Sequence, residues 1–339
     1  MSKFLSKYST YLRIGVSVGL FGFIAWRTDW SVVGTRFANL NIGLWLASVA
    51  VMVLAQVFSA RRWQLFAQEL GFTRTLSQYS AYYFIGTYFN LVLPTSVGGD
   101  VVRVWYLDGK SGRALAAFAS VFLERINGLL VLIGVSCVGA LVGMATGMEL
   151  PWWIHTCVWG VAGCALLGGL SLPILQRWSL VPANRRAQLK ALFDLVHVPK
   201  VLIGATFMSV LVQVIGVISF WLIGAALGLE VPVAYYCILG PMVSLLTLLP
   251  VSVNGIGLRE LGTVVFLAPL SVDEDSAKTL AFLWFAASVS VSLLGGLVYL
   301  FGAYPKASTT NLANEGTDDN GSVDRDTDQG REREYKQAA

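Results

Sequence analysis

Long runs of apolar residues recur along this chain and limit the folds that are open to it. Apolar residues fill 55% of the 339 positions, charged residues fill 13%, and the mean hydropathy is +0.65. A water-soluble fold of this length cannot bury so much apolar surface, and several runs reach the roughly 20 residues that a helix needs to cross a bilayer. Short alternating strands, which build membrane barrels, are absent from the sequence pattern. The sequence therefore predicts an all-α polytopic integral membrane protein.

We expect about six spanning helices and two re-entrant helical hairpins, which enter the membrane and turn back at a break rich in Pro and Gly. The expected spans are residues 14–26, 42–60, 116–144, 152–175, 201–227 and 279–303. The broken segments are residues 79–107 and 233–270, and their breaks are at residues 94–99 and 250–257. Together these segments form one expected membrane domain at residues 1–305.

The two breaks have similar sequences. LPTSVGGDVVR at residues 93–103 matches LPVSVNGIGLR at residues 249–259 in Leu, Pro, Ser, Val, Gly and Arg at equal offsets. Three expected spans separate the copies, and an odd number inverts the second copy relative to the first. The pattern therefore predicts an inverted repeat whose breaks meet near the bilayer midplane. Chance similarity between two turns is the alternative interpretation.

The breaks are candidate binding elements because their backbone leaves the helical hydrogen-bonding pattern. Such backbone persists in a membrane only where it faces protein or a water-filled cavity. Glycine permits positive φ and close approach of a ligand, and a helix that begins after a break directs its N–H groups toward an anion. Ordinary helix kinks are the alternative. The break residues that we select are Pro94, Ser96, Gly98, Gly99, Ser252, Asn254, Gly255 and Gly257.

Charged residues inside or beside the apolar runs must face inward and pair, because each would cost about 2.5–3.5 kcal/mol in lipid. They are Asp100, Arg103, Glu124, Arg125, Arg259 and Glu260, and we expect them to line one interior space. Arginine presents a donor fork that suits phosphate, so Arg103 and Arg259 are candidates for binding an anionic headgroup. The three acids would hold the arginines or accept protons, and Asn90, Ser96, Asn127, Ser252 and Asn254 would add neutral hydrogen bonds. Buried ion pairs that fix helix register are the alternative.

The loops and the end of the chain indicate topology. Most loop Lys and Arg, including Arg61 and Arg62, lie on one side of the expected layout, which predicts that both termini are cytoplasmic. Residues 306–339 hold five Lys and Arg against eight Asp and Glu and almost no large apolar residue, which is typical of a disordered acidic tail. The four cysteines and two histidines form no metal-binding spacing. We therefore expect no metal, no cofactor, no nucleic-acid partner and no catalytic residues.

The spacing of these motifs resembles the lysylphosphatidylglycerol synthase transmembrane family. The resemblance rests on Asn90-x3-Pro94-x3-Gly98-Gly99-Asp100-x2-Arg103, Glu124-Arg125 and Pro250-x4-Gly255-x-Gly257-x-Arg259-Glu260. It covers nearly all of residues 10–305. The resemblance implies a stand-alone member in a bacterial or archaeal inner membrane. In bifunctional relatives the membrane half is associated with moving the modified lipid, and a soluble domain attaches the amino acid.

Two functions remain open at this stage. The first is a lipid flippase for an anionic, phosphate-bearing lipid, with membrane lipids as partners. The second is a membrane enzyme, or an accessory to a lipid-modifying enzyme, in aminoacyl-phosphatidylglycerol or lipid-linked sugar synthesis. Because only the expected tail follows residue 303, the soluble lysyltransferase domain is not expected, and this favours the flippase.

Overall fold

The structure, a computed structural model, describes residue 34 and residues 39–93, 97–109, 111–177, 198–249, 251–252 and 254–302, without the side chains of residues 171–177. Regular structure in these ranges is helical, with no strand. The helices are α3 (Ile42–Glu69), α4 (Leu76–Val92), α5 (Gly98–Asp108), α6 (Ala114–Ala145), α7 (Trp152–Arg177), α9 (Pro199–Ala226), α10 (Val233–Leu248), α11 (Leu258–Leu267), η1 (Ala268–Leu270) and α12 (Glu274–Phe301). The expected span at residues 14–26 and the expected tail at residues 306–339 lie outside the described residues.

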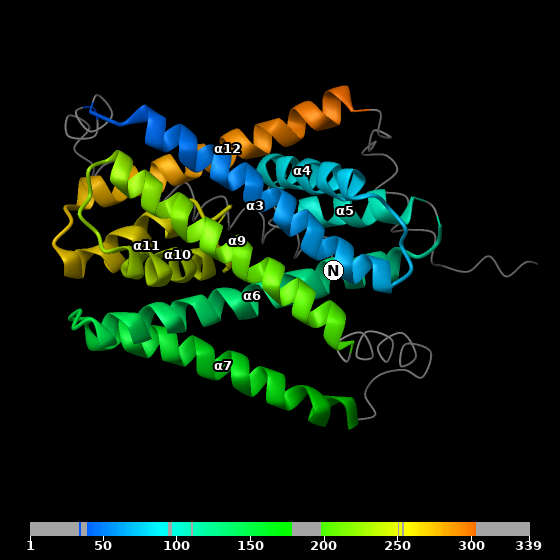
Figure 1. Ribbon diagram of the computed structural model, residues 1–339, viewed down its shortest axis with the longest axis horizontal. Coiled ribbons are helices and arrows are strands. Elements are labelled where there is room, and N and C mark those ends of the chain that lie inside the picture. Colours follow the sequence, from blue (N-terminus) through cyan, green and yellow to red (C-terminus); the bar gives the residue numbers. More distant parts are fainter. Residues whose placement is uncertain are drawn as a thin grey trace, which may run out of the picture. The chain divides into compact units, whose positions relative to one another are not determined.

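Five described helices, α3, α6, α7, α9 and α12, are long and apolar enough to cross a membrane. They correspond to five of the expected spans, and Figure 1 shows them running roughly along the long axis of the view. A helix of 28 residues such as α9 is about 42 Å long, which exceeds the roughly 30 Å of a hydrocarbon core. The structure confirms the all-α polytopic membrane protein that the composition predicts.

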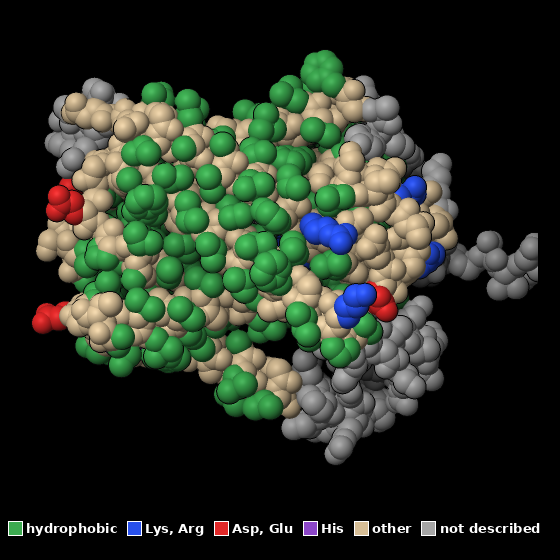
Figure 2. Space-filling view, in the orientation of Figure 1, with side chains coloured by type: hydrophobic (Ala, Val, Ile, Leu, Met, Phe, Trp, Pro, Cys, Tyr) green, Lys and Arg blue, Asp and Glu red, His purple; other side chains and the backbone are tan. Residues whose placement is uncertain are grey.

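The charged surface residues are distributed unevenly along this bundle. Figure 2 shows apolar side chains covering most of the visible face. The visible Lys and Arg side chains lie toward the end where α3 finishes, while acidic side chains lie at the other end and one more lies beside the basic group. An apolar band with charges toward its ends is the surface expected of a protein that spans a bilayer.

The first broken helix pair is α4 and α5, which pack on each other. A capping box between Thr75 and Gln78 begins α4, and the chain leaves the helix at Leu93. Gly98 and Gly99 do not adopt the positive φ that we expected, because they already belong to the first turn of α5. Gly99 is needed for another reason: a Cβ there would overlap the carbonyl oxygen of Gly86 on α4.

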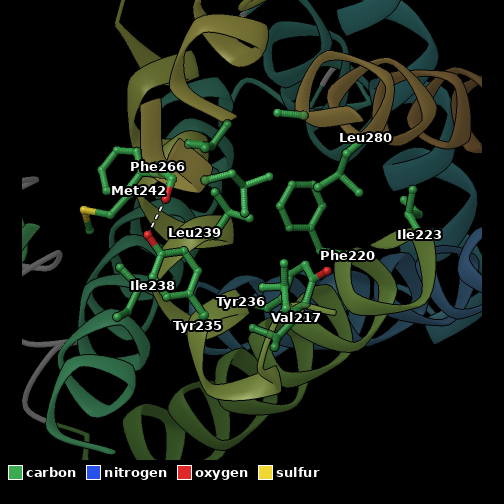
Figure 3. Packing of buried hydrophobic residues seen from close by; sticks show 14 of the residues in the cluster. Val217, Phe220, Ile223, Tyr235, Tyr236, Ile238, Leu239, Met242, Phe266 and Leu280 are labelled. Atoms are coloured by element: carbon green, nitrogen blue, oxygen red, sulfur yellow. Dashed lines mark hydrogen bonds between the residues drawn. The ribbon is translucent and has the colours of Figure 1, made fainter. Parts of the chain in front are cut away.

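The second broken pair is α10 and α11, which also pack on each other. Here the expected conformation is present, because Gly255 has a φ of 72° and Gly257 a φ of 86°. Figure 3 shows the apolar core around α10, in which the hydroxyl of Tyr235 donates to the carbonyl oxygen of Phe266 on α11. This bond and the surrounding side chains fix α11 against α10.

The two broken pairs lie toward opposite ends of the bundle in Figure 1. Helix α12 packs against both α4 and α11 and so contacts both pairs. The arrangement agrees with the expected layout, while the re-entrant topology and the inverted repeat stay predictions.

Helix α3 differs from its expected span. The sequence interpretation ended the span at residue 60 and placed Arg61 and Arg62 in a loop, but the helix continues to Glu69. Arg62 lies on its buried side, with 5% of its surface exposed. A basic residue can continue an apolar helix when an acid on a neighbouring helix pairs with it.

Candidate functional site

Five charged side chains from three helices form a group that we call the charge cluster: Arg62 of α3, Asp100 and Arg103 of α5, and Glu124 and Arg125 of α6. Glu124 pairs with Arg62, and its Oε2 lies 3.3 Å from Nη2 of Arg103. Asp100 lies 3.3 Å from Nη1 of Arg103 and 2.5 Å from Nε of Arg125. Each carboxylate therefore bridges two arginines, and Glu124 connects three helices.

The neighbours Glu124 and Arg125 point in different directions, as their adjacent positions on a helix predict. The side chain of Glu124 is 1% exposed, whereas that of Arg125 is 42% exposed. With its acids ionised, the cluster holds three arginines against two carboxylates. It therefore has a positive excess, and Arg125 is its most accessible member.

Arg103 is enclosed by aromatic rings as well as by acids. Its guanidinium carbon lies 4.3 Å from the ring centroid of Trp63 and 4.2 Å from that of Tyr83. Two rings therefore contact the guanidinium, and its Nη atoms contact Asp100 and Glu124, although its buried Nε has no partner among the described residues. These contacts favour a role in fixing the helices rather than the headgroup-binding role that the sequence suggested for Arg103.

Neutral residues extend the charge cluster toward α9. Arg62 donates to the hydroxyl of Ser209 at 3.0 Å, and that hydroxyl donates to Oδ1 of Asn127 at 2.5 Å. Asn127 also donates to Thr206 at 3.0 Å. The sequence interpretation missed Arg62 as a site residue. The sequence feature that could have identified Arg62 is Glu124, an acid in an apolar run whose partner had to come from another helix.

The second break forms a separate group of polar contacts. Glu260 accepts from the backbone N–H of Gly257 at 2.7 Å, and Arg259 donates through Nη2 to the carbonyl oxygen of Asn254 at 3.0 Å. Within the described residues, the buried hydroxyl of Ser252 has no hydrogen-bond partner. Within this break, then, the backbone is held by side chains of its own segment.

Arg259 differs from Arg103 in having no acid partner. Its residue surface is 9% exposed, and within the described residues it makes no ion pair. Its guanidinium carbon lies 4.7 Å from the ring of Phe285 and 5.4 Å from that of Trp284, both on α12. The buried Nη1 has no hydrogen-bond partner in the part of the chain that the structure describes. Such an arginine is suited to bind an anion.

The helix starts after the breaks are less open to anions than we expected. The N–H of Gly99 at the start of α5 donates to Oδ1 of Asn90 at 2.8 Å. At the start of α11, the N–H of Gly257 is bound by the carboxylate of Glu260. These two N–H groups already have acceptors, so a ligand at either helix start would have to bind other N–H groups or displace a side chain.

A hydrogen bond joins the second break to the end of α4. Nδ2 of Asn254 in the second break lies 3.3 Å from the carbonyl oxygen of Leu91, two residues before α4 gives way to the first break. The second break therefore lies against the last turn of α4, while the meeting of the two breaks in an inverted repeat stays a prediction. Pro94 and Ser96 lie outside the described residues, as does Pro250.

The six charged residues occupy two centres rather than the one expected space. Asp100, Arg103, Glu124 and Arg125 belong to the charge cluster, and Gly98, Gly99, Asn90 and Asn127 lie in or beside it. Arg259 and Glu260 belong to the second break with Ser252, Asn254, Gly255 and Gly257, and no ion pair among the described residues connects them to the cluster. The two sequence copies place their residues at equal offsets, but these residues make different contacts in the fold.

The fold and these centres define a class: a polytopic helical membrane protein with two broken helix pairs and buried charged groups. The family described as the lysylphosphatidylglycerol synthase TM region matches residues 11–296, and the chain belongs to that family. It is therefore a membrane protein related to lipid modification or transport. Searches of curated proteins and of solved structures found no match.

Proposed function

We propose that this protein moves an anionic, phosphate-bearing lipid between the leaflets of a membrane, with a phospholipid or a polyprenyl-phosphate-linked lipid as its cargo. The observation that carries the proposal is the hydrogen bond between Asn254 and Leu91, which joins the second break to the last turn of α4, next to the first break, inside an apolar bundle. Irregular backbone at membrane depth belongs where it faces protein or a water-filled space. Paired breaks in the two halves of a membrane protein are typical of a transporter's substrate site.

The buried charges support an anionic cargo. The charge cluster has one arginine more than it has acids, and Arg259 makes no ion pair with any described residue. A buried charge without a counter-ion is costly, so a site of this kind favours a ligand that brings the opposite charge. A phosphate group supplies this charge and accepts the donor fork of arginine.

The contacts also suggest which part moves. Ion pairs hold α5 of the first broken pair against α6, whereas the second break contains Gly255 and Gly257 at positive φ and a Ser252 hydroxyl that has no partner among the described residues. We assign the gate to the contact between Asn254 and Leu91. The path of the lipid headgroup opens when this hydrogen bond breaks, and it closes when the bond forms again.

A membrane enzyme, or an accessory of one, in aminoacyl-phosphatidylglycerol or lipid-linked sugar synthesis is the second candidate. The family description, which names a synthase, favours it. In either function we place the protein in a bacterial or archaeal inner membrane with cytoplasmic termini. A lipid-modifying enzyme would be its natural partner, because it would supply or consume the lipid.

Leaflet exchange in reconstituted vesicles tests the proposal. Purified full-length protein is placed in vesicles that contain phosphatidylglycerol labelled on an acyl chain, and a membrane-impermeant reductant then bleaches the label in the outer leaflet. The flippase predicts that nearly all label becomes accessible over minutes, whereas protein-free vesicles protect about half of it. A second arm supplies lysyl-tRNA and measures lysyl-phosphatidylglycerol.

The two arms separate the candidate functions. Protein-dependent exchange without lysyl transfer supports the flippase. Lysyl transfer by the isolated chain, or exchange equal to that of protein-free vesicles for phosphatidylglycerol and for polyprenyl-phosphate lipids, would overturn it.

A further inference from the structure

A cavity of about 280 Å³ lies between α3, α4, α6, α9, α10 and α12. Its volume is just below the about 300–1,000 Å³ of pockets that enclose drug-sized ligands, so it fits a headgroup rather than a whole lipid. Its wall is largely apolar. The polar side chains that line it are Gln56, Thr87, Gln213, Ser244, Ser288 and Ser292.

The lining offers mainly acceptors for hydrogen bonds. Thr87 and Ser288 donate their own hydroxyl hydrogens to helix carbonyls one turn earlier, at 2.7 and 2.9 Å, which leaves the oxygens as acceptors. Nε2 of Gln213 donates to the carbonyl oxygen of Gly128 at 3.2 Å, so its Oε1 is likewise available. Gln56 makes no hydrogen bond within the described residues and can both donate and accept.

No charged side chain among the described residues lines this cavity. A phosphate or an ammonium group buried there would lack a counter-ion, and burying an unpaired charge is strongly unfavourable. Hydroxyl groups have no such penalty, because each can donate to the acceptors of the wall. The chemistry of the cavity therefore fits an uncharged group that carries several hydroxyls.

Arg259 lies behind one wall of the cavity. The indole of Trp284 lines the cavity, and the guanidinium carbon of Arg259 lies 5.4 Å from the centroid of that ring. The guanidinium of Arg259 therefore packs near a ring that lines the cavity, and its Nη1 has no hydrogen-bond partner among the described residues. A phosphate bound at Arg259 would lie near Trp284 and the cavity that this ring lines.

We propose that the cavity holds an uncharged, hydroxyl-rich head while Arg259 binds the phosphate that links this head to the lipid. The inference rests on the proposed flippase function and adds a substrate class. The cargo is a phosphate lipid with a glycerol or sugar head, in preference to one with no head or with a cationic aminoacyl head.

Exchange rates of four acyl- or prenyl-labelled lipids in the same vesicles test this assignment. Phosphatidylglycerol carries the glycerol head, phosphatidic acid has the phosphate alone, lysyl-phosphatidylglycerol adds a cation, and a polyprenyl-phosphate sugar carries the alternative head. We expect phosphatidylglycerol or the polyprenyl-phosphate sugar to exchange at least about fivefold faster than phosphatidic acid, as expected from one net hydrogen bond. The faster of the two identifies the source of the head.

Substitutions of residues in the cavity wall test whether this lipid preference arises in the cavity. Gln56→Leu, Gln213→Leu and Ser292→Ala should each lower the ratio of phosphatidylglycerol exchange to phosphatidic acid exchange by about two- to tenfold. Ser290→Ala is the matched control for Ser292→Ala, because Ser290 lies on α12 as well. Its hydroxyl donates to the carbonyl oxygen of Ala286 at 2.9 Å, and it does not line the cavity. That control should keep the wild-type ratio.

For variants that exchange lipid poorly, a binding measurement tests the same preference. In detergent micelles, phosphatidylglycerol should raise the melting temperature of the wild-type protein more than phosphatidic acid does, and Gln56→Leu should remove the difference. Equal exchange of all four lipids, faster exchange of lysyl-phosphatidylglycerol, or equal melting shifts would overturn this inference and leave the flippase intact. Absence of exchange for every lipid would overturn both.

Discussion

Glu124 shows how one residue can organise an apolar bundle. It is 1% exposed on its side chain and accepts from two arginines that belong to other helices. Among the described residues, its removal leaves Arg62 without an acid partner and Arg103 with Asp100 as its one acid partner. A buried carboxylate of this kind stabilises the fold chiefly because its absence would leave cations unpaired.

We predict that Glu124→Gln destabilises the protein by about 3–5 kcal/mol, the range for breaking a buried ion pair. The measurement is the midpoint of thermal unfolding in detergent micelles. Glu149→Gln is the control, because Glu149 is exposed in the loop after α6 and makes no ion pair among the described residues. An unfolding midpoint for Glu124→Gln equal to that of the control would show that the charge cluster does not hold the helices.

Arg103 and Arg259 occupy equal offsets in the two sequence copies but should respond differently to lysine. Arg103→Lys loses the paired fork and part of the ring contacts, so we expect a loss of about 1–2 kcal/mol in stability. Arg259→Lys keeps a charge beside Phe285, so we expect a normal melting temperature and about tenfold slower lipid exchange, or ~1.4 kcal/mol. The opposite pattern, a stable but inactive Arg103→Lys with an active Arg259→Lys, would assign anion binding to the first break.

At the scale of elements, the close approach of α4 and α5 depends on the absence of a side chain at Gly99. A Cβ there would overlap the carbonyl oxygen of Gly86 and lie 2.7 Å from the side chain of Asn90. The same Asn90 accepts from the Gly99 N–H and so holds the start of α5. Separation of the two helices would also displace Arg103, whose stem contacts Gly86.

Gly99→Ala should therefore destabilise the protein by at least about 1–3 kcal/mol, the usual cost of overpacking. Gly134→Ala on α6 is the matched control, because nothing lies within 4 Å of its added Cβ and alanine favours helix. Thermal melts of both variants check the prediction. A Gly99→Ala protein as stable as the control would mean that α4 and α5 do not pack as closely as described.

The positions of the helices could largely be predicted from the sequence, because the hydropathy and length of each segment determine them. The expected span at residues 116–144 became α6, Ala114–Ala145, with ends displaced by one or two residues. Helix α3 runs to Glu69 because Arg62 finds an acid on α6, and no pattern within α3 contains that information. The break residues were predictable from Pro and Gly, whereas the partners of Arg103 and Arg259 depend on packing between distant helices.

At the scale of the whole molecule, two broken helix pairs meet where Asn254 contacts the carbonyl oxygen of Leu91. Helix α12 packs against α4 and α11 and so connects the pairs along their length. Large movements of either pair would have to break this contact. The proposed route for a headgroup therefore depends on whether the breaks can separate.

A cross-link between the breaks should form readily. The variant carries Leu91→Cys and Asn254→Cys, with the four native cysteines, Cys137, Cys157, Cys164 and Cys237, replaced by serine. We expect efficient intramolecular coupling by a short, reducible thiol cross-linker, detected by mass spectrometry. Leu91→Cys combined with Glu149→Cys is the negative control, because Glu149 lies in the loop between α6 and α7.

Lipid exchange by this cross-linked protein tests the central claim most directly. Exchange of labelled phosphatidylglycerol is measured before cross-linking, after it and after reduction of the cross-linker. If a headgroup passes where the breaks separate, exchange should fall to the level of protein-free vesicles when they are linked and return when the link is cleaved. Exchange that continues unchanged in fully cross-linked protein would contradict the account.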